Sequence, residues 1–399
     1  MKRIILAAIT IFLSAGLCGA QAILDRNHLD GVRSQLHRPT YASAYDALLR
    51  NADSLLDVKP YSVMDKERNS PSGDNHDYTS LARYFHPDTT KADGLPYVNR
   101  DGISNPELAL YDRNRLGTTA NRVRDLALAW YFSRDERYAA KAAELLNVWF
   151  LDPSTRMNPH FEYAQMVPGV NNNKGRCYGV LDGYSFIDML DGVALLEGSA
   201  SWTDTDNEKL KSWMSSLLDW ILTSPQGVEE ANAANNHSTA YDAQAIALAI
   251  YTGRHDIARS ILEAFPSRRL FAQIAPDGSQ PHEMDRTLSF HYSHYNLTHF
   301  IDIMLMARKM GMNLDTLTDS EGRSFYKAVN YMASYLGREQ SEWPGLQIQD
   351  WQPAQQALAK DLWRVASALD TSRTHYRELY KRYGTANPAD RFILLYYAD

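Results

Sequence analysis

The sequence predicts an all-α protein with a single folded domain. Apolar residues recur at helical spacing from about Tyr41 onward. The helical segments come in pairs joined by short polar links, and strand-like alternation is scarce. No clear boundary separates two folded domains. Paired helices without a sheet leave three architectures open: a bundle, a solenoid, or a ring with an inner and an outer layer of helices.

The helix pairs follow from spacing and capping. Residues 42–56 have the apolar period of a helix. Residues 119–132 have it too, and Asp135 can cap a second helix that runs to Phe150, so that the two form an antiparallel hairpin. The same unit recurs in later segments: 238–251 with 256–264, and 286–310 with 324–336. The end of the chain, residues 391–399, fits either a helix or a strand.

Three long segments without helical spacing interrupt this pattern. They cover residues 68–106, 151–180 and 273–284. Long ordered loops in a compact helical domain tend to be functional. We therefore expect functional residues in these segments.

The overall composition narrows the class of protein. The chain has 399 residues, of which 44% are hydrophobic, and a formal net charge of −7. These values suit a globular protein with a large core. The negative charge argues against an electrostatic grip on nucleic acid or on an anionic membrane. A polyanionic substrate stays possible, because a local basic cleft can lie on an acidic protein.

The first 22 residues have the features of an export signal. Lys2 and Arg3 precede an apolar run, residues 4–17, which is short for a membrane span. Small residues follow, so cleavage near Ala20 or Ala22 is expected. We therefore assign residues 1–22 to a signal peptide and residues 23–399 to the folded domain, and we expect a periplasmic or secreted protein.

The two cysteines of the chain bear on processing and on stability. Cys18 suggests a lipoprotein, but Leu17 before it is not the small residue that such processing favours. Removal of the signal peptide leaves only Cys177, so neither an intramolecular disulfide nor a cysteine zinc site is expected. No later segment is apolar enough to cross a membrane.

The first segment that could carry chemistry is residues 235–242, with the sequence NNHSTAYD. An Asn pair and a His precede a strongly apolar helix. Simple capping by Asn235 or Asn236 explains the pair equally well. His237 nevertheless falls in the first turn, and Tyr241 lies one turn further along the same face. This spacing places a titratable ring and a phenol together at the mouth of a helix.

The second segment is residues 278–295, with the sequence GSQPHEMDRTLSFHYSHY. A loop leads into a helix dense with polar aromatic residues. Arg286 and Tyr292 are poor choices for a plain core. The structural alternative is that Tyr292 and Tyr295 are buried with satisfied hydroxyl groups, while Arg286 pairs with a neighbouring acid.

These residue types are the ones that a uronan lyase needs. The reaction removes the C5 proton beside a carboxylate and then breaks the C4–O bond, so donors and cations must stabilise the intermediate. Asn236 and Arg286 can supply a donor and a positive charge. His237 can bind the carboxylate or act as a base. A Tyr can transfer a proton alone on one face, or together with His237 across opposite faces.

The motifs resemble those of the alginate lyase superfamily of helical toroid enzymes. The resemblance rests on NNHSTAYDAQAIALAIYTGR, on IAPDGSQPHEMDRTLSFHYSHYNL and on an upstream stretch, residues 135–170, and it covers about residues 100–310. Within the superfamily the chain most resembles polysaccharide lyase family 38. The resemblance implies an (α/α) toroid, β-elimination on alginate without a cofactor, and a catalytic set of Asn236, His237, Arg286 and a Tyr.

The sequence offers three candidates for the catalytic Tyr. In some relatives it lies seven residues after the Arg, and here that position is Ser293. Tyr292 lies one position earlier and Tyr295 two positions later. We predict Tyr292 and keep Tyr295 and Tyr241 as alternatives.

Further residues are predicted to bind the anionic polysaccharide. Most lie in the long segments, and two begin the helix near residue 119, where backbone N–H groups favour anions. For any one of them, an ordinary surface or capping role is at least as good an explanation. The predicted set is Asn121, Arg124, Asn158, Tyr163, Gln165, Arg176, Tyr241, His282, Glu283 and Tyr295.

Other functions remain open at this point. Glucuronan is an alternative substrate for the same fold. A metal site would use His291 and His294, with His282 and Glu283 upstream, but the spacing is weak and no metal is predicted. A glycoside hydrolase would need two facing carboxylates from Asp242, Glu230, Glu283 and Asp285. A non-catalytic glycan-binding protein is the third alternative.

Overall fold

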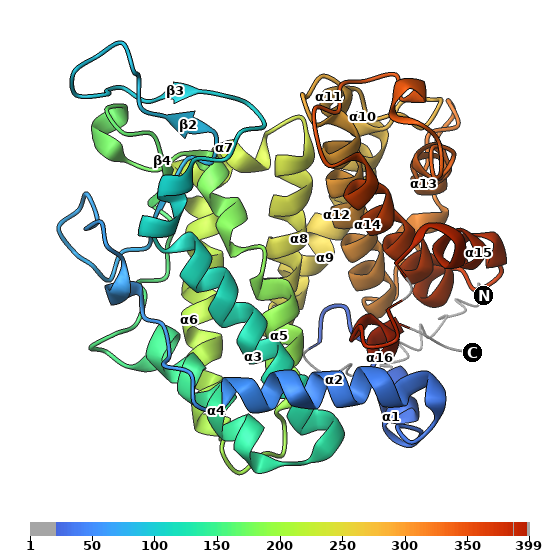
Figure 1. Ribbon diagram of the computed structural model, residues 1–399, viewed down its shortest axis with the longest axis horizontal. Coiled ribbons are helices and arrows are strands. Elements are labelled where there is room, and N and C mark those ends of the chain that lie inside the picture. Colours follow the sequence, from blue (N-terminus) through green and yellow to red (C-terminus); the bar gives the residue numbers. More distant parts are fainter. Residues whose placement is uncertain (1–20, 386, 397–399) are drawn as a thin grey trace, which may run out of the picture.

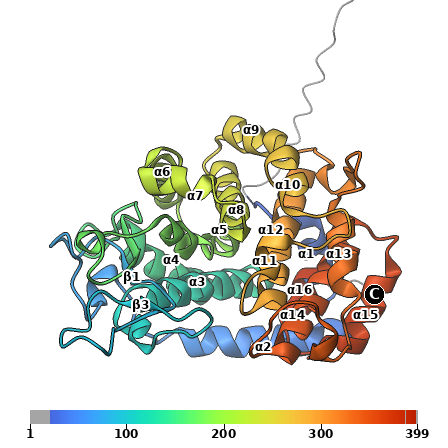
Figure 2. The same ribbon diagram turned by 90° about the horizontal axis from the view of Figure 1, so that it is seen from above.

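The computed structural model describes residues 21–385 and 387–396, and their helices form a ring of two layers (Figures 1 and 2). In the inner layer each helix packs against the inner helix that follows it in the sequence. These inner helices are α3 (Arg113–Ser133), α5 (Phe186–Leu195), α8 (Asn236–Tyr251), α12 (Ser289–Lys309) and α14 (Trp351–Arg364). The fold is therefore the predicted (α/α) toroid, and the all-α prediction is confirmed.

The outer helices pack against the backs of the inner ones. The helix α4 covers α3, α6 and α9 cover α8, α13 covers α12, and α15 covers α14. The outer helices are α2 (Pro39–Leu55), α4 (Glu136–Leu146), α6 (Asp204–Thr223), α9 (His255–Phe265), α13 (Phe325–Ala333) and α15 (Thr374–Tyr383). Short helices complete the described chain: α1 (Arg26–Arg33), α7 (Pro225–Ala231), α10 (Phe271–Gln273), α11 (Pro281–Met284) and α16 (Phe392–Tyr396).

The inner helix α8 shows how the ring leaves one side chain open to solvent. All of its residues are buried except His237. Its many alanines let neighbours approach closely on every side, as a helix enclosed by other helices requires. Because His237 lies in the first turn, it is the one α8 side chain that reaches partly into solvent.

Several predicted boundaries need correction. The helix α12 begins at Ser289 rather than at Arg286, so Arg286 lies in the turn between α11 and α12. The helix α3 begins at Arg113, before the predicted start. Asp135 does cap α4, because its carboxylate accepts the N–H of Arg137. The described end of the chain is helical, as α16 shows.

The long segments contain two small sheets that the sequence pattern did not reveal. The strand β1 (Thr79–Leu81) pairs in parallel with β4 (Tyr163–Met166). The strand β2 (Phe85–His86) pairs with β3 (Val98–Asn99) in antiparallel fashion. Strands of two to four residues are too short to show alternation. They join two of the predicted functional segments above one end of the ring, beside α7 (Figure 1).

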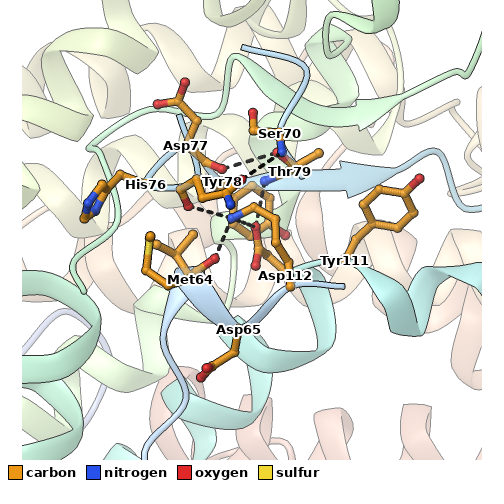
Figure 3. Close-up of polar contacts among 12 residues, drawn as sticks. Met64, Asp65, Ser70, His76, Asp77, Tyr78, Thr79, Tyr111 and Asp112 are labelled. Carbon is orange, nitrogen blue, oxygen red and sulfur yellow. Dashed lines mark hydrogen bonds and ion pairs between the residues drawn. The ribbon is translucent and has the colours of Figure 1, made fainter. Parts of the chain in front are cut away.

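A buried ion pair anchors this end of the ring. The ammonium nitrogen of Lys66 lies 3.2 Å from Oδ2 of Asp112, and both side chains are fully buried. The same oxygen accepts the N–H of Thr79 at 2.9 Å (Figure 3). Burial raises the pKa of Asp112 to about 6 and lowers the pKa of Lys66. The pair ties β1 to the start of α3.

The predicted signal peptide lies almost wholly outside the described residues. Residues 1–20, including Cys18, are not described, so its cleavage and the predicted location are not tested. Among the described helices, none combines the length and apolarity needed to cross a membrane.

Candidate active site

His237 is held by a buried carboxylate at the head of α8. Its Nδ1 lies 2.6 Å from Oε1 of Glu230, a residue of α7 that is fully buried. The ring of Tyr178 packs against the imidazole with centroids 4.3 Å apart. An ionised Glu230 can only accept a hydrogen bond, so Nδ1 carries the proton and Nε2 keeps a free lone pair. His237 is thus prepared to accept a proton.

Asn236 is fixed by a second buried carboxylate. Glu283 of α11 accepts the Asn236 N–H at 2.6 Å and its side-chain Nδ2 at 2.7 Å. Asn235, not Asn236, caps α8, because its side chain accepts the His237 N–H. The capping explanation therefore applies to Asn235 and leaves the Asn236 amide for another role.

Glu283 also links the two predicted motifs electrostatically. Burial raises its pKa, and electrostatic interactions with the neighbouring side chains of Arg286 and His237 both oppose that rise. The head of α8 and the α11–α12 turn therefore form one site, although their residues are far apart in the sequence.

Arg286 contacts a carboxylate and an aromatic ring at once. Its guanidinium donates to Oδ1 of Asp101 at 2.8 Å, and its central carbon lies 3.8 Å from the centroid of the Tyr292 ring. Asp101 also accepts the hydroxyl of Thr287 at 2.9 Å. Asp101 belongs to the segment after β3, so this segment reaches across to the α12 side of the ring.

Tyr292 also contacts the segment that contains Asp101. Its hydroxyl lies 2.7 Å from the hydroxyl of Tyr84. Burial and the contact with Tyr84 raise the pKa of Tyr292 well above its usual value near 10. The phenol is therefore protonated at neutral pH and can donate a proton.

The two alternative tyrosines lie in different surroundings. Tyr295 packs its ring against His299 with centroids 4.2 Å apart, and burial raises its pKa to about 12 although Arg113 opposes the rise. Tyr241 is buried, and its hydroxyl donates to the backbone oxygen of Ile221 in α6. The structure thus places Tyr241 in the core between two helices, away from the predicted role, and leaves Tyr295 near the site.

Two predicted binding residues gather beside His237. The Nε2 of Gln165 donates to the backbone oxygen of Tyr178 at 3.0 Å. The guanidinium of Arg176 lies over the Tyr178 ring, 4.7 Å from its centroid. Since Tyr178 itself packs on His237, these residues border the cluster around His237.

Other predicted binding residues are not brought to this cluster. Arg124 lies in a separate cavity with Asp188, to which it donates at 3.2 Å. Asn158 donates to Asp77 at 2.7 Å and so fastens a loop. The rest are surface or half-buried residues for which no contact with the cluster is found: Asn121, Tyr163 and His282.

Sequence reasoning missed four residues that shape the site. Glu230 was considered only as a hydrolase acid, and Tyr84, Asp101 and Tyr178 were not selected. Tyr84 lies 208 residues before its partner Tyr292, so no local pattern could join them. For Tyr84, Asp101 and Tyr178 the available signal is their place in the segments 68–106 and 151–180, and Glu230 lies outside both.

The geometry weighs against the hydrolase alternative. Asp242 is taken up by two bonds from Arg269, at 2.9 and 3.1 Å, in the core. Glu230 and Glu283 each hold a neighbouring side chain rather than face an open gap. Of the metal candidates, His294 pairs with Asp361 at 2.9 Å, and the described residues contain no group of three or more potential metal ligands.

Comparisons with known proteins agree on one family. The family model described as alginate lyase matches residues 62–343. An alginate lyase from Bacteroides ovatus has a solved structure with a TM-score of 0.93 and 41% identity, covering 96% of this chain and 100% of that one. No curated protein sequence matches significantly.

More distant structures share the fold. Alginate lyase A1-III from Sphingomonas species A1 aligns with a TM-score of 0.55 and 15% identity, covering 90% of this chain and 97% of its own. A His-to-Ala variant of A1-III, complexed with a tetrasaccharide, aligns at 0.56 and 14%, covering 95% of this chain and 98% of its own. At such identities the likeness concerns the fold alone.

Proposed function

Because the chain belongs to the alginate lyase family and is therefore a polysaccharide lyase, we propose that Asn236, His237, Arg286 and Tyr292 form its catalytic site. The observation that carries this proposal is the position of Glu283. It bonds Asn236 twice and lies within electrostatic reach of both His237 and Arg286. Tyr292 joins the set through the Arg286 guanidinium on its ring.

In this proposal Arg286 and Asn236 bind the uronate carboxylate. The C5 proton is very weakly acidic while the neighbouring carboxylate is charged. A guanidinium and an amide N–H placed on the carboxylate oxygens stabilise the extra negative charge as the proton leaves. The second N–H of the Asn236 amide serves this role, since the first is bonded to Glu283.

The protons are then moved by His237 and Tyr292. His237 takes the C5 proton on Nε2, the C4–C5 double bond forms, and the C4–O bond breaks. Tyr292 gives its proton to the leaving oxygen. Its raised pKa keeps the phenol protonated for this step, and Glu230 stabilises the imidazolium that forms. If C5–H and the leaving oxygen shared a face, Tyr292 would have to act as a phenolate base, which its raised pKa disfavours; the proposal therefore assigns the base role to His237.

An adjoining groove is proposed to hold further sugar units. A cavity of about 600 Å³ is lined by Arg176 and Tyr178 from the His237 side and by Lys174 and Trp220 beyond them. Cations suit uronate carboxylates, and aromatic rings suit sugar faces. The tetrasaccharide bound by the A1-III variant supports a polymeric ligand for this fold. Membership of polysaccharide lyase family 38 remains a prediction.

We also propose that the protein is exported through its N-terminal signal peptide, to the periplasm or beyond. The charged start, the apolar run of residues 4–17 and the small residues after it support this location. Alginate is too large to enter a cell intact, so an enzyme that meets the polymer outside the cytoplasm is consistent with the proposed substrate.

The test is ultraviolet absorbance of the unsaturated uronate, with polymannuronate, polyguluronate and glucuronan offered separately. We expect turnover of at least one alginate block, and loss of turnover in His237→Ala, Arg286→Ala and Tyr292→Phe. Tyr241→Phe is the matched control, because its hydroxyl lies in the core, and it should stay active. A fully active, well-folded Tyr292→Phe variant, with Tyr295→Phe inactive, would transfer the role to Tyr295. Reducing ends without absorbance would indicate a hydrolase.

A further inference from the structure

At the end of the ring away from α11, the first described residues pass between α5 and α16 (Figure 1). The backbone of this segment contacts the side chain of Asp191 in α5, and Asp191 is only 2% exposed. Its carboxylate accepts the backbone N–H groups of Ala22, of Ile23 at 2.9 Å and of Leu24 at 2.6 Å. A buried side chain thus recognises the backbone of the N-terminal segment.

Among the described residues, no cationic side chain forms an ion pair with Asp191. Lys309 acts on it electrostatically, but its ammonium donates to the backbone oxygens of Leu24 and Gln21. The three N–H donors and Lys309 lower the pKa of Asp191, but burial outweighs them and raises it to about 6. A cation at the position of one of these donors would complete the site.

The sequence can supply that cation. Ala20, Gln21 and Ala22 form the small-x-small pattern that signal peptidases cleave, and Ile23 follows directly. We propose that the signal peptide is removed between Ala22 and Ile23, and that the new α-ammonium group of Ile23 forms a buried ion pair with Asp191. This inference rests on the proposed export. The step is a hydrolysis: water supplies the hydroxyl of the Ala22 carboxyl group and a proton to the Ile23 amine.

The hydrogen bonds to Asp191 balance after cleavage, while Lys309 loses its bond to the Gln21 oxygen. The Ile23 nitrogen already lies 2.9 Å from Oδ2 of Asp191, and an ammonium has three N–H groups. One keeps this bond, and a second can replace the lost donor of Ala22 at Oδ1. Leu24 keeps its bond to Asp191 and its contact with Lys309.

The alternative cleavage after Ala20 fits less well. It would retain Gln21, which is 2% exposed and whose side-chain nitrogen has no hydrogen-bond partner among the described residues. Such an unsatisfied buried amide costs about 1–3 kcal/mol in typical proteins. It would also leave Asp191 with uncharged donors only. Since Ala22 and Ile23 are buried, cleavage must precede the docking of this segment.

The first experiment determines the mature N-terminus. The full-length chain with its own signal peptide is expressed in a Gram-negative host, and the periplasmic protein is analysed by intact mass and N-terminal sequencing. A chain that begins at Ile23 supports the proposal. A chain that begins at Gln21, or at a lipidated Cys18, overturns it while export stands. A chain that keeps Met1 in the cytoplasm overturns both.

The second experiment tests the ion pair itself. A chain that begins at Ile23 is compared with one that carries a single extra Gly before Ile23, which keeps the N–H but moves the charge. Each is made with Asp191 and with Asp191→Asn. We expect the extension to lower the folded-to-unfolded ratio about tenfold or more with Asp191, and to have little effect with Asn. Asp188→Asn, an exposed acid on the same helix, should preserve the effect. Equal effects in both Asp191 backgrounds would show that no ion pair forms.

Discussion

The hydrogen bond between His237 and Glu230 allows the fall in kcat of a Glu230→Gln variant to be predicted. In Glu230→Gln the shape of the side chain is kept, and an amide oxygen can still accept from Nδ1. The negative charge beside the imidazolium is lost. The bond is short, at 2.6 Å, and Glu230 is fully buried, so solvent screens it little. Hydrogen bonds to charged groups contribute about 1.5–3 kcal/mol. That loss corresponds to a roughly 10- to 150-fold fall in kcat.

The assay is the initial rate of absorbance increase on the preferred alginate block, with kcat and KM determined separately. Because the imidazolium exists only after proton transfer has begun, we expect kcat to fall while KM changes little. Glu263→Gln removes the same charge from an exposed position on the outer helix α9 and should leave kcat unchanged. An unchanged kcat in Glu230→Gln on every polymer, with the fold intact, would refute the role of His237 as the base.

The remaining predictions concern one binding contact and two buried groups. Asp101→Asn should lower KM roughly two- to fivefold in the same assay, because a partly exposed ion pair worth about 0.5–1 kcal/mol no longer competes for Arg286; a higher KM would contradict this. Lys66→Met should lower the free energy of unfolding by about 3–5 kcal/mol in urea titrations, since Asp112 is left buried without its cation, and Lys66→Met with Asp112→Leu should recover part of it. Burial lowers the pKa of His299 to about 3, so the unfolded chain binds its proton first as pH falls below about 6.5. Stability should therefore fall by up to about 1.4 kcal/mol per pH unit from this residue, and His299→Asn should flatten the slope between pH 6 and 4.

The sequence predicted the helical part of the site because its signals are local. Asn235 lies just before an apolar helix and caps it, and the same spacing places His237 in the first turn. Tyr241 shows where such local reasoning ends. An inner helix is buried on all sides, so sharing a face with His237 does not bring Tyr241 to the cleft.

The parts that the sequence could not predict depend on contacts between distant segments. Arg286 was assigned to the following helix, whereas it lies in the turn before α12 and there meets Asp101, 185 residues earlier. Tyr84 reaches Tyr292 through a segment whose regular structure is mainly three short strands. Neither helical period nor turn chemistry specifies such a crossing, because the partners share no local pattern.

The three acids of the site clarify how an anionic polymer can bind there. Glu230 and Glu283 are buried, and each bonds to a side chain with a proposed catalytic role, so neither carboxylate can easily leave its position. Asp101 differs, because it is partly exposed and bonds to the guanidinium that is proposed to hold the uronate. A uronate carboxylate that replaces Asp101 on Arg286 exchanges one anion for another, and the local charge stays nearly constant. Binding then costs little repulsion from the two buried acids, which explains how a site built on carboxylates can accept a polyanion.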